Sequence, residues 1–267
     1  MSGTGVETRP EAGAEAGREI SPWDWTDVLL SLVFGPPIAL AIGFGLITVV
    51  IPLLPGSDHG LRNAMTNLLG DVALYAGLLA AAVGLVVQRR RASPRALGLR
   101  RASLSWIAAA VPLGVLAYVL ATLVGLIGVA LLPHAQNCQP TTVRRAFGGY
   151  VPLAVVLVTL IAPFAEETLF RGFLFGWLRG RAPLWMAVVV SAALFAASHV
   201  QPVLLLPTFV LGCLLALVYQ RSGSLVPGMI VHGVFNAVGI AGIFLLPPTP
   251  APNCPAASAM LAILLPR

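Results

Sequence analysis

The sequence predicts an all-α, polytopic membrane protein built as a bundle of about seven to eight transmembrane helices. Hydrophobic residues make up 58% of the 267 positions and charged residues only 10%, and the mean hydropathy is +0.90. This balance leaves too little polar surface to cover a soluble globule of this size. In addition, apolar runs of about 20 residues, the length that crosses a ~30 Å hydrocarbon core, recur along the chain.

Seven runs fit this length, and they cover residues 27–54, 67–88, 105–132, 150–178, 183–200, 203–220 and 225–246. The first and fourth are longer than a span requires. Pro36 and Pro37 can break or kink the first, and Pro163 can do the same to the fourth. The last apolar piece, from Ala256 to Leu265, is too short to cross the membrane and is predicted to lie at the interface or to re-enter.

The distribution of arginine predicts the orientation, because the chain contains no lysine. Because successive spans alternate in direction, every second loop lies on the same side of the membrane. Three such loops carry Arg89, Arg90, Arg91, Arg95, Arg100, Arg101, Arg179, Arg181 and Arg221. The positive-inside rule places these loops and the N-terminus in the cytoplasm, and seven spans then place the C-terminus outside. Arg144 and Arg145 on the outer side are the main exception. Topology thus accounts for the net charge of +6 without nucleic-acid binding, since no aromatic-interleaved basic module is present.

The ends of the chain differ from its apolar middle. Residues 1–22 are rich in Gly, Ala and Glu and predict a short disordered cytoplasmic tail rather than a secretory signal. Trp23 and Trp25 are predicted to mark the first membrane interface. Residues 23–149 contain membrane helices without a distinctive motif, and residues 248–267 form a short apolar tail.

The three cysteines divide by position. Cys213 lies within a span, where a small hydrophobe is expected to pack. Cys138 and Cys254 both fall on the predicted outer side, where a disulfide between them can persist. Three free thiols are the alternative.

An acidic pair stands out at membrane depth. After Asp71 the only acidic residues are Glu166 and Glu167, side by side in an apolar stretch. An ionised carboxylate there costs roughly 2.5 to 3.5 kcal/mol, so intramembrane acids are candidates for function. On a helix, Glu167 and Arg171 share a face and can pair, whereas Glu166 is rotated by about 100°. One glutamate can therefore be held by the arginine while the other faces a cavity as a general base.

Two histidines and an amide occupy the later spans: His199, His232 and, one turn after His232, Asn236. Together with Glu166 they can activate water and stabilise an oxyanion. Each also has a structural interpretation. The acid–arginine pair can be only an ion pair, His199 can be interfacial, and His232 with Asn236 can be an interhelical hydrogen-bond clamp.

The motifs E-E-x-x-x-R, F-x-x-x-H and H-x-x-x-N follow one another in apolar helices, at Glu166, Glu167, Arg171, Phe195, His199, His232 and Asn236. Their order and spacing resemble the CPBP family of intramembrane endopeptidases, which includes the type II CAAX prenyl proteases and the bacterial Abi proteins of bacteriocin processing and immunity. The resemblance covers about residues 150–240 and predicts a catalytic core over residues 150–247.

The resemblance implies an all-helical membrane fold with a polar intramembrane cavity that opens toward the cytosol and the bilayer. Glu166 would activate water with the assistance of His199, while His232 and Asn236 would hold the developing oxyanion. The second glutamate and the arginine of the first motif would shape the site.

The function predicted from this resemblance is hydrolysis of a peptide bond near the membrane, in a peptide or a lipidated protein of possible CaaX type, with membrane lipid as the other partner. No cofactor is expected. The alternative is a zinc ion held by Glu166, His199 and His232, although no H-E-x-x-H helix is present. A non-catalytic immunity factor or chaperone, or a small transporter with a proton relay, is the competing class of protein.

Overall fold

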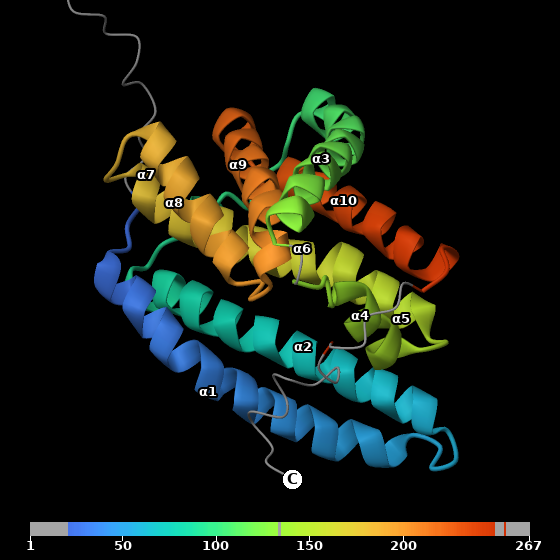
Figure 1. The fold of residues 1–267 in the computed structure, drawn as a ribbon. Coiled ribbons are helices and arrows are strands. Elements are labelled where there is room, and N and C mark those ends of the chain that lie inside the picture. Colours follow the sequence, from blue (N-terminus) through green and yellow to red (C-terminus); the bar gives the residue numbers. More distant parts are fainter. Residues whose placement is uncertain (1–20, 133–134, 249–253, 255–267) are drawn as a thin grey trace, which may run out of the picture.

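The computed structural model describes residues 21–132, 135–248 and 254. Within these residues every regular element is a helix, which confirms the all-α prediction (Figure 1). The predicted disordered tail and the short apolar tail lie almost wholly outside the described residues.

Five long helices dominate the fold: α1 (Trp25–Val50), α2 (His59–Gly84), α3 (Leu104–Leu131), α9 (Leu205–Ser222) and α10 (Leu225–Leu245). The fourth span is a succession of short pieces: α5 (Val151–Val156), the π-helix η4 (Leu157–Ile161), α6 (Ala162–Glu166), the π-helix η5 (Glu167–Phe175) and α7 (Gly176–Arg179). The remaining elements are η1 (Ile51–Leu53), η2 (Leu85–Arg89), η3 (Pro94–Leu97), α4 (Gln139–Phe147), α8 (Leu184–Ala197) and η6 (Pro202–Leu204).

Six stretches of the described chain are long and apolar enough to cross a membrane, which makes this a multi-pass membrane protein. The predicted span over residues 183–200 was wrong in length. Its helix α8 has 14 residues, which corresponds to about 21 Å at 1.5 Å per residue and falls short of the hydrocarbon core. The helix ends early because the backbone turns at Val200, with a φ of +56°, and Pro202 follows.

The three arginine-bearing loops share one end of the bundle. The Leu225 N–H donates to the Gly98 carbonyl, so α10 begins beside the loop after α2. Arg181, after α7, donates to the Trp23 carbonyl at 3.0 Å and so reaches the start of α1. This common end agrees with the arginine pattern, while the side of the membrane that it faces stays a prediction.

Trp23, which was predicted to mark the first membrane interface, is buried among the helices. Its side chain is 1% exposed, stacks on Phe173 with ring centroids 5.6 Å apart, and donates its indole N–H to the Phe173 carbonyl. A buried carbonyl satisfies the polar edge of the indole that otherwise favours the interface. Trp25, in contrast, is exposed on the surface of α1.

Helices α1 and α2 form an antiparallel pair along one side of the bundle (Figure 1). Small residues set their separation. A Cβ added to Gly77 of α2 would lie 2.3 Å from the Ala39 nitrogen of α1, so only glycine permits this approach. Close packing on small residues is a common way for membrane helices to associate.

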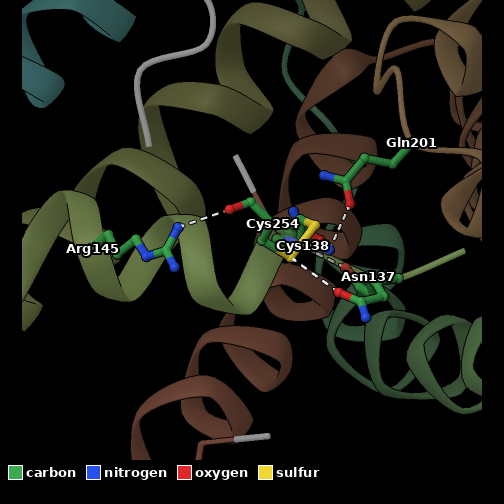
Figure 2. The surroundings of a disulfide bond; sticks show 7 residues. Asn137, Cys138, Arg145, Gln201 and Cys254 are labelled. Carbon is green, nitrogen blue, oxygen red and sulfur yellow. Dashed lines mark hydrogen bonds between the residues drawn. A yellow bond between two sulfur atoms is a disulfide. The ribbon is translucent and has the colours of Figure 1, made fainter. Parts of the chain in front are cut away.

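A disulfide joins Cys138 to Cys254, so of the two states that the sequence left open, the bridge and the free thiols, the structure has the bridge (Figure 2). The backbone of both residues is held by polar side chains. Gln201 accepts the Cys138 N–H at 3.0 Å, and Arg145 donates to the Cys254 carbonyl at 3.1 Å. The bond therefore fixes residue 254, beyond the end of α10, against the start of α4. Cys213 is free, as predicted.

Candidate active site

The acidic pair lies at a change of helix type. Helix α6 ends at Glu166, and the π-helix η5 begins at Glu167. π-helical turns are rare and are frequent at functional sites. The fourth span is therefore broken where its two glutamates stand, in a region that Pro163 already marked as irregular.

Pro163 also explains the position of Asn236. In η4 the Ala162 N–H donates to the Leu157 carbonyl, five residues back. The next donor in this register would be Pro163, which has no N–H. The Val158 carbonyl instead accepts a hydrogen bond from Asn236 Nδ2 of α10 at 2.8 Å. Asn236 thus has the interhelical clamp role that was one interpretation of its sequence position.

Glu167 and Arg171 form the predicted pair, and both are fully buried. Arg171 Nη1 donates to Glu167 Oε1 at 3.0 Å, and Nη2 donates to the Gly212 carbonyl of α9 at 3.1 Å. The guanidinium also lies 4.4 Å from the ring centroid of Phe195. A buried ion pair needs such additional partners to offset the desolvation of its charges.

Glu166 points to a different environment, as its rotation on the helix predicted. Its side chain is 17% exposed, whereas that of Glu167 is fully enclosed. Tyr75 of α2 donates its hydroxyl to Glu166 Oε1 at 2.6 Å, and His232 Nε2 lies 3.7 Å from Oε2. Glu166 is thus a carboxylate accessible at one side and contacted from two helices.

His232 joins the two glutamates. Its ring is buried in α10, with Nδ1 3.0 Å from Glu167 Oε1 and Nε2 facing Glu166. A neutral imidazole that donates Nδ1–H to Glu167 keeps Nε2 as an acceptor. Glu167 therefore orients this ring toward Glu166.

His199 is placed through Phe195. Its Nδ1 lies 2.9 Å from the Phe195 carbonyl, and the two rings meet edge to face with centroids 5.0 Å apart. The same phenyl ring contacts His232, at 5.8 Å between centroids. The two histidines are thus neighbours of one aromatic ring. The F-x-x-x-H motif contained Phe195, but its contact with His232 is visible only in the structure.

Tyr75 is the site residue that sequence reasoning missed. It stands one helical turn after Asp71 in an otherwise apolar part of α2, so a polar i, i+4 pair within a span was the available signal. The 91-residue separation from Glu166 gave no indication that the two side chains meet.

A cavity of about 470 Å³ lies between α3, α4, α9 and α10 and reaches the site at Asn236. Its lining is mainly apolar, and Gln139 and Arg144 of α4 contribute polar groups at its far end. That end is opposite the arginine-bearing loops, since Arg144 Nη2 donates to the Leu246 carbonyl just after α10. The cavity therefore extends from the site away from the arginine-bearing end of the bundle.

The zinc alternative was tested by the positions of its three ligands. Among the described residues no group of three or more His, Cys, Asp or Glu side chains is arranged to hold a metal ion. His199, His232 and Glu166 are therefore not arranged as a zinc site in this structure.

The fold and the site define a multi-pass membrane protein with a carboxylate–imidazole centre enclosed by its helices. Residues 148–238 match the family model described as type II CAAX prenyl endopeptidase Rce1-like. This match confirms the resemblance to the CPBP family over about a third of the chain. The matched segment contains the six site residues predicted from the sequence, but not Tyr75.

Three curated relatives are similar to the chain over this part. It is 30% identical over 95 residues to an uncharacterized 24.3 kDa protein of Escherichia coli, 34% of this chain and 44% of that protein. It is 32% identical over 91 residues to UPF0177 protein YxdF of Lactococcus lactis subsp. lactis (strain IL1403), covering 34% and 50%. The identity to uncharacterized protein YpbD of Bacillus subtilis (strain 168) is 33% over 84 residues, covering 32% and 42%. The chain thus spans half or less of the length of these relatives. No solved structure matches the chain.

Proposed function

We propose that this protein is an intramembrane endopeptidase in which Glu166 activates the attacking water. One observation supports this most directly: Glu166 is partly exposed beside His232, while its neighbour Glu167 is buried against Arg171. A general base needs a free carboxylate within reach of a water and a second group that orients the reaction. Glu166 supplies the free carboxylate, and Glu167 holds His232 beside it.

The water would lie between Glu166 Oε2 and His232 Nε2. Their 3.7 Å separation is too long for a direct hydrogen bond, and one water can interact with both groups. Glu166 takes a proton from this water, the hydroxide oxygen bonds to the carbonyl carbon of the scissile peptide, and the proton is passed to the leaving amine. The products are a carboxylic acid and an amine.

The oxyanion formed in this step needs donors. Asn236 Nδ2 carries two hydrogens, of which the Val158 carbonyl takes one. The second is the donor proposed for the oxyanion, together with His232, whose Nε2 receives the water's proton from Glu166 before this proton passes to the leaving amine. His199, which contacts the same Phe195 ring as His232, is proposed to assist Glu166. A metal-free reaction is favoured because the residues present do not form a zinc ligand set.

The proposed substrate is a peptide or a lipid-anchored protein whose scissile bond reaches membrane depth. A prenylated CaaX-type protein is the first candidate because residues 148–238 match the Rce1-like model. The proposed orientation places the N-terminus in the cytoplasm, on the side of the arginine-bearing loops.

The test uses the full chain in lipid nanodiscs with a panel of prenylated, acylated and unmodified peptides, with wild type compared with Glu166→Gln. We expect cleavage by wild type, with or without a chelator, and a loss of about 10²- to 10⁴-fold in kcat for the variant at an unchanged melting temperature. Equal cleavage by both proteins would contradict the proposal. Transport or immunity that survives Glu166→Gln would favour the non-catalytic class. Loss of activity on metal stripping and its return with zinc would overturn the metal-free mechanism.

A further inference from the structure

Tyr75 lies outside the segment that matches the family model, yet its side chain contacts the proposed base. The hydroxyl donates to Glu166 Oε1 at 2.6 Å, a distance typical of a strong hydrogen bond to a carboxylate. This contact joins α2, in the N-terminal part of the chain, to the matched segment at residues 148–238.

The contact selects which oxygen of Glu166 is available. Oε1 is engaged by Tyr75, and Oε2 is the oxygen that faces His232 Nε2. A carboxylate held at one oxygen cannot rotate freely about its terminal torsion, which is otherwise broad. The free oxygen is therefore directed to the place proposed for the water.

Tyr75 is itself held by packing. Its ring is partly buried against an apolar cluster that includes Phe147 and Leu157. The helix that carries it is fixed two residues further on, because Gly77 packs against the Ala39 backbone of α1. A side chain locked in this way can fix the geometry of a reacting group, as functional sites require of their supporting residues.

We propose that Tyr75 is a positioning residue of this site, which orients Glu166 Oε2 toward the water and His232. The inference rests on the proposed function and assigns the α1–α2 pair a role in it, namely the rigid support of Tyr75. Tyr75 contacts neither the water nor the scissile bond in this scheme, so its effect is exerted through Glu166.

The test compares Tyr75→Phe with Tyr150→Phe in the same nanodisc assay. Tyr150 is a matched control, because its hydroxyl also donates to a carboxylate, that of Asp58, but at the start of α2 and away from Glu166. For Tyr75→Phe we expect a fall in kcat of about 10- to 100-fold, as for a misplaced reacting group, with KM and the melting temperature unchanged. For Tyr150→Phe we expect kcat and KM like those of wild type.

A second replacement keeps the hydroxyl and alters only the ring. We expect 3-fluorotyrosine at position 75 to retain most of the wild-type rate, because its hydroxyl can still donate to Glu166. An equal loss in the fluorinated and Phe proteins would assign the effect to ring packing and overturn the inference. Wild-type kcat in Tyr75→Phe, or a change confined to KM, would also overturn it while the proposed function stands. Wild-type rates in Glu166→Gln would overturn both.

Discussion

The α1–α2 pair and the fourth span are both long, apolar and membrane-spanning, but they are built differently. The helices α1 and α2 run as α-helix for 26 residues each and approach closely at Gly77. The fourth span changes between α and π geometry four times and buries an ion pair. The difference indicates that regular helices packed on small residues supply rigidity, whereas an interrupted helix supplies free carbonyls and inward-facing charges.

The largest effect expected from this comparison is the loss of the buried arginine. Arg171→Met leaves the Glu167 carboxylate buried without its cation, which typically costs about 3 to 5 kcal/mol. We expect a strongly lowered melting temperature in detergent and poor recovery of folded protein. Pairing the change with Glu167→Gln should restore much of the stability. A singly substituted Arg171→Met protein as stable as wild type would show that the pair is not needed to hold the interrupted span.

The second-largest loss of stability is expected from removal of the disulfide, because this bond fixes a segment beyond the matched region to α4. The double substitution Cys138→Ser and Cys254→Ser is expected to lower stability by about 2 to 4 kcal/mol, with the matched single change Cys213→Ser close to neutral. Thermal unfolding of the three proteins under non-reducing conditions tests this. No difference between wild type and the double variant would mean that the bond adds nothing to the fold.

The close packing of α1 against α2 is tested by adding one methyl group at their contact. Gly77→Ala places a Cβ 2.3 Å from the Ala39 nitrogen, so the two helices must move apart, at a cost of about 1 to 3 kcal/mol. Gly45→Ala is the matched control, because nothing lies within 4 Å of a Cβ there. We expect a lower melting temperature for the first and an unchanged or higher one for the second. Equal values would contradict close packing as the source of rigidity.

The smallest effect concerns the start of α1. Asp24 caps this helix, and hydrogen bonds from Thr26 and then from Arg90 hold the pKa of its carboxyl well below the ordinary value. A lowered pKa adds stability above the unfolded pKa of about 4, and this stability is lost as the pH falls through the folded value. The difference in melting temperature between wild type and Asp24→Asn should therefore be present at pH 7 and shrink below about pH 4. A difference independent of pH would contradict it.

Sequence reasoning was reliable where one helix carries the whole pattern. The Glu167–Arg171 pair and the divergence of Glu166 follow from spacing on a single helix, and the arginine pattern located the loops that share one end. It was wrong for residues 183–200, where hydropathy continued past the helix end at Ala197.

The remaining features depend on contacts between distant segments. Pro163 signalled an interruption, but not that Asn236 would bond the carbonyl left free beside it. Tyr75 and Glu166 are 91 residues apart, and Phe195 of α8 meets His232 of α10. Spacing along the chain carries no information about such partners without the fold.

The central claim is that Glu166 performs the chemistry while Glu167 holds the structure. It is tested most directly by measuring kcat and melting temperature together for Glu166→Gln in nanodiscs, on the best peptide of the panel. The account predicts a folded protein with wild-type melting temperature whose kcat is lower by about 10²- to 10⁴-fold. A folded Glu166→Gln protein that cleaves at the wild-type rate would contradict it.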